Sequence, residues 1–120
     1  MMQIKYSPTA LEKLQRIKSD ICIRFGEERS SAVMQAVVSS IDRLATDPLI
    51  GPSAASVFGV DTTYRRLFVS HFHLFYQINA DAIEIVDVYH EREDILYKLF
   101  GVSTISEESE QYWDDFDHNQ

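Results

Sequence analysis

Two apolar stripes at helical spacing, separated by a single glycine, constrain this chain more than any other feature. Apolar residues recur every three or four positions after Ser7-Pro8, and again after Gly26. Such spacing places apolar side chains on one face of a helix. The stripes consist of Leu11, Leu14, Ile17, Ile21 and Phe25, and of Val33, Val37, Ile41 and Leu44. Because the connection is so short, the two helices are predicted to form an antiparallel hairpin.

Local residues mark the ends of both helices. Ser7 offers a hydroxyl at the N-cap, and Pro8 occupies the first helical position, where its missing N–H costs nothing. Gly26 tolerates the left-handed backbone that ends a helix. The Asp-Pro pair at 47–48 stops the second helix, because proline disfavours helical geometry in the residue before it. Residues 47–62, rich in Pro, Gly and small side chains, are predicted to form a loop.

Three runs of aromatic and β-branched residues follow, and they are typical of strands. The runs cover 64–69, 71–78 and 82–90. Tight turns near Ser70 and at 79–81 predict an antiparallel meander. A short strand at 3–6 precedes the helices, and a short helix is predicted over about 93–100. The order β-α-α-β-β-β-α predicts an α+β domain in which the helical hairpin packs on a small antiparallel sheet.

The excess negative charge is concentrated in the last eighteen residues. The net charge of the 120-residue chain is −8, but six of its 19 carboxylates and none of its 11 basic residues lie in 103–120. The remainder is near −2, which argues against a general polyanion binder. We divide the chain into a folded domain over 1–102 and an acidic, aromatic C-terminal tail over 103–120. The tail is predicted either to be a disordered segment that aids solubility, or to dock near Arg65 and Arg66 on its own body or a neighbouring copy.

Cysteine usage and hydropathy limit the compartment and the cofactors. The single Cys22 excludes a disulfide framework and a cysteine-based zinc site within one chain. No apolar run resembles a secretory signal or approaches the roughly 20 residues that span a bilayer. A soluble, cytoplasmic domain with no membrane partner is expected. The chain has no HExxH helix, so no metal and no other cofactor is expected.

Five motifs, in the same order along the chain, resemble toxins of the RelE/ParE superfamily from bacterial type II toxin–antitoxin modules. They are YSPTALEKL, RFGEE, LATDPLIG, YRRL and LFYQI with IEIVDVYHERED, and they cover residues 3 to 101. The resemblance implies a growth-inhibiting toxin held inactive by a cognate antitoxin, which we expect on the helical hairpin and the sheet surface. RelE-like members cut messenger RNA in the ribosomal A site. ParE-like members bind and inhibit DNA gyrase without being nucleases.

The nuclease branch can be checked residue by residue, because RNA cleavage needs a base, a cation and an acid. The catalytic candidates are Arg66, His73, His90 and Arg92. Arg65 and Arg66 are also candidates for contact with a target. RelE-like nucleases that resemble this chain carry an arginine at the position of His73, which favours the ParE-like branch. His71 and His73 share a strand face by period-two geometry. With His90 they form either an acid–base or metal cluster, or separate hydrogen-bonded or exposed side chains.

The stretch HERED, residues 90–94, lies where the last strand meets the last helix. Its spacing resembles the ParE-like junction more than the basic RelE-like one. We predict an architectural joint in which Asp94 caps the helix, Arg92 neutralises Asp94 and His90 ends the strand. Tyr97, one helical turn further on, is predicted to pack against its neighbours.

Three functions are therefore kept. The first is a ParE-like toxin that binds a protein target such as DNA gyrase. The second is a ribosome-dependent mRNA endonuclease, and the chain is an enzyme only in that case. The third is a non-toxic binding module of the same fold. The oligomeric state is left open, a homo-oligomer included.

Overall fold

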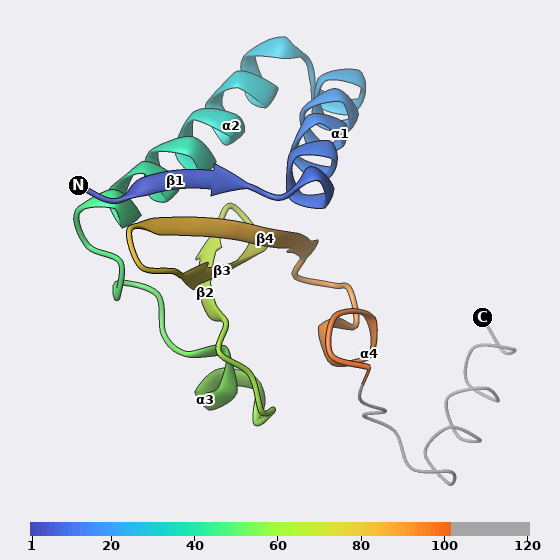
Figure 1. Ribbon diagram of the computed structural model, residues 1–120. Coiled ribbons are helices and arrows are strands. Elements are labelled where there is room, and N and C mark those ends of the chain that lie inside the picture. Colours follow the sequence, from blue (N-terminus) through green and yellow to red (C-terminus); the bar gives the residue numbers. More distant parts are fainter. Residues whose placement is uncertain (102–120) are drawn as a thin grey trace, which may run out of the picture.

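Within residues 1–101, the last strand lies inside the sheet, between the first strand and the third. A computed structural model describes residues 1–101 and shows a four-stranded sheet in the order β1-β4-β3-β2 (Figure 1). The strands are β1 (Gln3–Tyr6), β2 (Arg65–Val69), β3 (Phe72–Ile78) and β4 (Ala82–His90). The helices are α1 (Pro8–Phe25), α2 (Glu27–Asp42), the 3-10 turn η1 (Arg43–Ala45), α3 (Ala54–Phe58) and α4 (Ile95–Lys98). The predicted α+β class and element order are confirmed, with α3 added. The acidic segment 103–120 lies outside the described residues.

The sheet is mixed, because β1 runs parallel to β4 while β2, β3 and β4 form the predicted antiparallel meander. A bulge interrupts the pairing of β3 with β4. Tyr76 pairs with Ile85 and Phe75 with Asp87, which leaves Val86 as an extra residue. An extra residue reverses the alternation of side chains between the two faces of a sheet. Ile85 and Asp87, two positions apart, therefore face opposite sides.

Helix α1 begins and ends where local chemistry predicts. The Ala10 N–H donates a hydrogen bond to Ser7 Oγ at 3.0 Å, with Pro8 at the start of the helix. The Ser7 hydroxyl in turn donates to the Val86 carbonyl at 2.6 Å, which ties the helix start to the bulge in β4. Gly26 ends the helix with φ of 96°, a region that favours glycine, and α2 follows at once.

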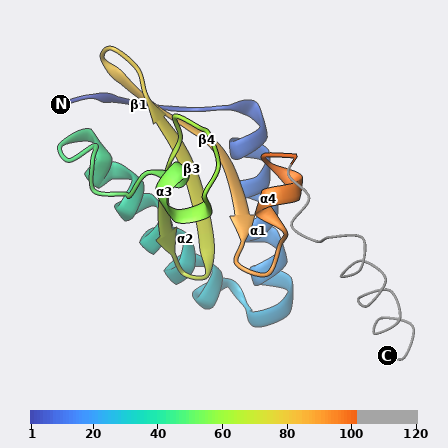
Figure 2. The same cartoon turned by 90° about the horizontal axis from the view of Figure 1, so that it is seen from below.

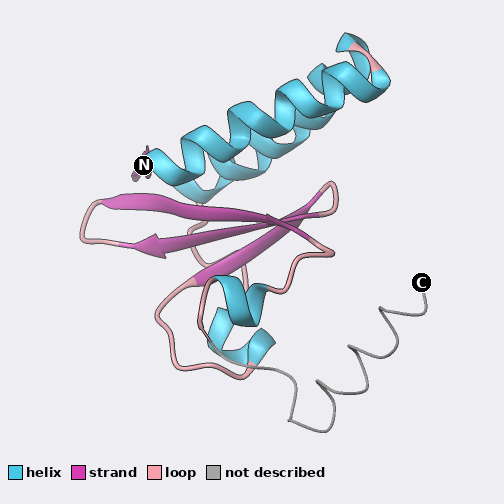
Figure 3. Ribbon diagram, turned by 90° about the vertical axis from the view of Figure 1, so that its right-hand side faces the viewer, coloured by secondary structure: helices cyan, strands magenta, loops and turns pink. Residues whose placement is uncertain are grey.

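The helical hairpin covers one face of the sheet and encloses the larger core. The buried members of this core are Ala10, Leu14, Val37, Ile41, Leu44, Leu74, Tyr76, Ile83, Ile85 and Val88. Three residues of the predicted α1 stripe do not join it, namely Leu11, Ile21 and Phe25. Leu11 is 47% exposed and Phe25 is 68% exposed. Phe25 is the last residue of α1. Figure 3 shows that the end of the hairpin where the two helices connect projects beyond the sheet. Only the first turns of α1 pack against β4.

Two short helices, α3 and α4, lie on the opposite face of the sheet (Figure 2). The loop predicted over 47–62 is wrong at Ala54–Phe58, which form α3. Ala54 is fully buried, and the Phe58 ring packs 5.8 Å from the ring of Phe75 on β3. Tertiary packing thus overrides the turn-like composition of this segment. Helix α4 is shorter than the predicted 93–100 and spans four residues.

Candidate functional site

Arg66 and His73 lie together on the face of the sheet that carries α3. Strand register places them there, because Phe68 of β2 pairs with His73 of β3, and Arg66 lies two residues before Phe68. The Arg66 guanidinium carbon is 5.8 Å from the centre of the Phe58 ring and 5.7 Å from that of Phe68. The His73 ring is 5.9 Å from Phe58 and 4.9 Å from Phe68. These four residues, Phe58, Arg66, Phe68 and His73, are termed the Arg66 face.

Two nitrogen atoms of the Arg66 face are buried without a hydrogen-bond partner among residues 1–101, Arg66 Nε and His73 Nδ1. Burial lowers the pKa of the His73 imidazole, and the nearby Arg66 charge lowers it further, so the ring is neutral at pH 7. Burial also lowers the pKa of Arg66, which stays cationic because arginine ordinarily titrates far above neutral pH. A guanidinium framed by aromatic rings suits a carboxylate or phosphate that adjoins a flat apolar group.

Arg65, the other predicted target contact, points to the opposite face and is already engaged. Its Nε donates to the Gly51 carbonyl at 2.7 Å, and its Nη2 donates to the Leu49 carbonyl at 3.3 Å. A Cβ at Gly51 would lie 2.6 Å from the Arg66 carbonyl oxygen and 2.8 Å from the Tyr76 hydroxyl. Only glycine permits this approach. Arg65 therefore secures the loop before β2, and Arg66 is the arginine of the pair that contributes to the Arg66 face.

The three histidines do not form the predicted cluster. His90 pairs with Phe72, the neighbour of His73, so His73 and His90 face opposite sides of the sheet. The His90 ring lies 5.3 Å from the Phe72 ring. His71 belongs to the turn before β3, and its Nδ1 lies 2.8 Å from Glu91 Oε1. Within residues 1–101, no group of three or more His, Cys, Asp or Glu side chains is placed to hold a metal ion.

The junction after β4 is an architectural joint, but Glu93 rather than Asp94 makes its ion pair. His90 ends the strand and Asp94 caps α4, as predicted. The predicted pair of Arg92 with Asp94 is wrong, since no ion pair joins them among the described residues. Glu93 instead accepts from the His90 N–H at 2.8 Å and from Lys98 Nζ at 3.0 Å. Burial opposes ionisation of Glu93, but these two hydrogen bonds outweigh it and lower the pKa of the carboxyl.

Beside this joint, Arg92 and Tyr97 are exposed. Tyr97 is 65% exposed, so the prediction that it packs against its neighbours is wrong. Leu99 and Phe100 make those contacts instead. The Phe100 ring reaches under α3, where it lies 6.4 Å from the ring of Phe58.

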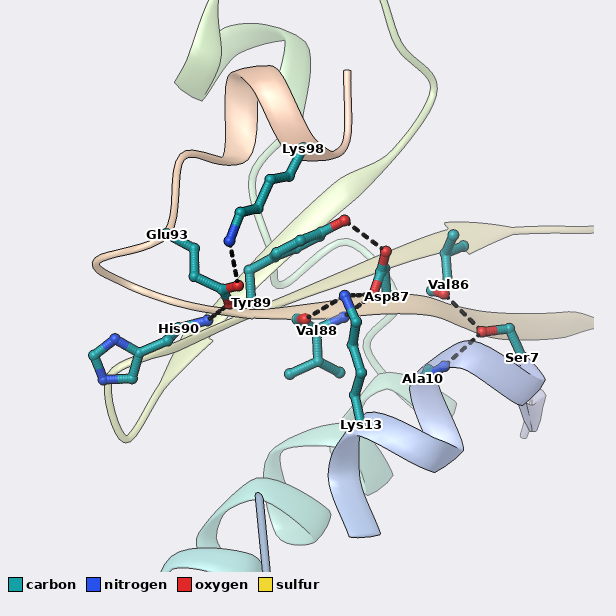
Figure 4. Close-up of polar contacts among 10 residues, drawn as sticks. All are labelled: Ser7, Ala10, Lys13, Val86, Asp87, Val88, Tyr89, His90, Glu93 and Lys98. Atoms are coloured by element: carbon teal, nitrogen blue, oxygen red, sulfur yellow. Dashed lines mark hydrogen bonds and ion pairs between the residues drawn. The ribbon is translucent and has the colours of Figure 1, made fainter. Parts of the chain in front are cut away.

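A row of side chains seals the free edge of β4, and the sequence analysis missed it (Figure 4). Strand β1 covers only residues 82–85 of β4. Beyond that point Asp87 Oδ1 accepts from the Val88 N–H at 2.8 Å, and Lys13 Nζ donates to the Val88 carbonyl at 3.3 Å. Lys13 Nζ also lies 2.7 Å from Asp87 Oδ1, and the Tyr89 hydroxyl donates to Asp87 Oδ2 at 2.8 Å. Asp87, an aspartate inside an apolar strand, is the sequence feature that could have revealed this row. Buried carboxylates are rare unless they are paired.

The family model described as the ParE toxin of the type II toxin–antitoxin system, parDE, matches residues 4–95. The chain belongs to the ParE toxin family. The predicted superfamily is confirmed, and the matched residues run from β1 to the first residue of α4.

One solved structure similar to this ParE-family chain is described as the chromosomal ParDE TA system from P. aeruginosa. The TM-score is 0.64 at 20% sequence identity, with 75% of this chain and 96% of that chain covered. At this identity the likeness shows a shared fold. A comparison with curated proteins finds no match. Among residues 1–101, every helix of the ParE-family chain is too short or too polar to span a lipid bilayer.

The ParE-family chain has a second surface feature, a groove of about 420 Å³ between α1 and the ends of β3 and β4. Its apolar walls are Ile17, Ile21, Phe25, Phe72 and Val88. Its polar rim is Lys13, Arg16, Asp20, Arg24, His90 and Glu93. The groove opens on the hairpin side of the sheet, whereas the Arg66 face lies on the α3 side.

Proposed function

We propose that this chain is a growth-inhibiting toxin that binds a protein target such as DNA gyrase in the cytoplasm, and that a cognate antitoxin neutralises it. Family membership supports the toxin role. The observation that carries target binding is the pairing of Arg66 with Phe68, which is 48% exposed. Aromatic and arginine side chains are enriched at protein interfaces. The Arg66 face is our candidate for the target contact.

The placement of the nuclease candidates favours binding over cleavage. General acid–base catalysis requires groups that reach the same reacting atoms. His90 faces away from Arg66 and His73, and Arg92 lies beyond the end of β4. A ribosome-dependent endoribonuclease remains the second candidate function, because Arg66 and His73 do share a face and could together contact a phosphate.

We assign the antitoxin to the groove beside α1. The apolar wall of this groove includes Phe25, which is 68% exposed, together with Ile17, Ile21, Phe72 and Val88. Large exposed apolar surfaces mark sites of protein interaction. An amphipathic helix supplied by a partner binds such a groove through its apolar face. In this arrangement the antitoxin and the target contact opposite sides of the sheet.

Expression of the chain alone in bacteria tests the proposal. We expect growth arrest with early loss of DNA synthesis and filamentation, prevented when the product of the neighbouring gene is co-expressed. Arg66→Gln should relieve the arrest. Arg29→Gln, which removes the same charge from an exposed position on α2, should not. Early loss of protein synthesis with cleaved messenger RNA would instead support the endoribonuclease, and unimpaired growth would support a non-toxic binding module.

A further inference from the structure

The described part of the chain ends beside the Arg66 face. After α4 the Phe100 ring packs against Phe58, and it also lies 5.9 Å from the ring of Phe75 and 6.3 Å from that of Tyr64. Phe58 in turn lies under the Arg66 guanidinium. A single aromatic ring therefore separates Phe100 from Arg66. Residues beyond Gly101 start at the margin of this surface.

Residues 103–120 supply the carboxylates that the Arg66 face lacks. Segment 103–120 contains three Glu, three Asp and no Lys or Arg, interleaved with Tyr112, Trp113 and Phe116. Carboxylates are the preferred partners of a guanidinium fork, and aromatic rings pack on other aromatic rings. The Arg66 face offers a guanidinium with an unpaired buried Nε, within residues 1–101, beside the half-exposed ring of Phe68. The segment therefore offers the opposite charge to Arg66 and aromatic rings that could pack beside Phe68.

Because residues 103–120 belong to the same chain as the Arg66 face, even a weak contact between this segment and that face is sufficient for docking. Trp113 follows Gly101 by twelve residues, and an extended residue spans roughly 3.3 Å, so the segment reaches across the Arg66 face. A short tether gives an effective concentration on the order of millimolar. A contact of millimolar affinity, far too weak to hold two separate molecules together, would then be populated within one chain.

We infer that residues 103–120 dock on the Arg66 face of their own chain, with carboxylates on the Arg66 guanidinium and an aromatic side chain against Phe68. Arg65 takes no part, because the backbone carbonyls of Gly51 and Leu49 already occupy it. The docked segment covers the surface assigned above to the target, so it competes with target binding. That consequence rests on the proposed function, whereas the docking itself does not.

Fluorescence of Trp113, the only tryptophan of the sequence, reports docking directly in the full chain. We expect native emission that is blue-shifted and protected from acrylamide relative to the unfolded protein, at every protein concentration. Arg66→Gln and Phe68→Ser should each shift the emission to the red and increase quenching. Arg29→Gln serves as the charge-matched control and should change neither. Far-UV circular dichroism verifies that each variant is folded.

Three results would overturn the inference. Solvent-like emission of the native chain would show that the segment is free. A blue shift unchanged in both Arg66→Gln and Phe68→Ser would place it elsewhere, and a blue shift lost on dilution would mean that a second copy supplies it. The consequence for function is tested separately by changing Asp114, Asp115 and Asp117 to Asn, which should increase growth inhibition. Suppose that Trp113 is docked in the parent chain and that the triple Asn variant inhibits growth no more strongly than the parent chain. That result would contradict target contact at the Arg66 face but would leave docking intact.

Discussion

Lys13 and Asp87 join α1 to the edge of β4 through an ion pair of 2.7 Å, in which the Asp87 side chain is 11% exposed and the Lys13 side chain 30%. The bulge at Val86 turns Asp87 away from the hairpin side, and Lys13 reaches around the strand edge to meet it. The Lys13 ammonium also lies 3.8 Å from the centre of the Tyr89 ring. This contact fixes the start of α1, and with it one wall of the groove.

Replacing Lys13 with Met keeps the apolar stem but leaves the Asp87 carboxylate without its cation. Removal of one partner from a buried pair is costly, and because Lys13 is partly exposed we expect a loss of about 1–3 kcal/mol in the free energy of unfolding. Urea unfolding at pH 7 measures it. Arg16→Met, one turn along α1, breaks an exposed pair with Glu12 and should cost less than about 0.5 kcal/mol. Equal losses in the two variants would contradict this role.

The pKa of the His73 imidazole, which lies near Arg66, can be measured by NMR titration. Burial and the Arg66 charge both lower the pKa of the His73 imidazole. Its titration midpoint should therefore fall below the ordinary value of about 6.5. In Arg66→Gln the midpoint should rise, because the imidazolium no longer faces a cation. A His73 midpoint that does not move would show that the two side chains are not neighbours in solution.

The turn between β2 and β3 contains two non-glycine residues with positive φ, Ser70 at 52° and His71 at 72°. A side chain in this conformation costs roughly 1–2 kcal/mol. His71→Gly and His71→Ala both remove the exposed contact with Glu91, but only glycine relieves the backbone. We expect the glycine variant to be more stable than the alanine variant by about 1 kcal/mol. This is the reverse of their order inside a regular helix or strand, and thermal unfolding of the pair would reveal it.

Protonation of Glu93 at acid pH lowers the free energy of unfolding. The pKa of Glu93 is lowered in the folded chain by the hydrogen bonds from His90 and Lys98. The stabilisation is therefore complete above the ordinary glutamate pKa of about 4.3 and is lost as pH falls through the lower folded value. Glu93→Gln should be less stable than the parent chain at pH 7, and the difference should shrink below about pH 4.

Elements set by local chemistry could be predicted from the sequence. Ser7 and Pro8 start α1, Gly26 separates the helices, and Asp94 caps α4, because each acts on backbone within a few residues of itself. The family resemblance rested on the same elements in order. Helix α3 could not be predicted, since Phe58 is ordered by a ring on a distant strand, Phe75.

The candidate site depended on pairing that the sequence does not encode locally. Arg66 and His73 come together because β2 and β3 pair in one particular register. The three-histidine cluster failed because His90 pairs with Phe72, the neighbour of His73. Likewise, alternation along β4 cannot reveal the extra residue at Val86. Without the bulge, Asp87 would face the same side as Ile85.

Inhibition of purified DNA gyrase tests the central claim most directly. The assay follows supercoiling of relaxed plasmid by gyrase as the purified chain is added. We expect inhibition by the parent chain and by Arg29→Gln, and at least about tenfold weaker inhibition by Arg66→Gln, as for an arginine that dominates an interface. Full gyrase activity in the presence of the parent chain, together with cleavage of messenger RNA when ribosomes are supplied, would contradict the account.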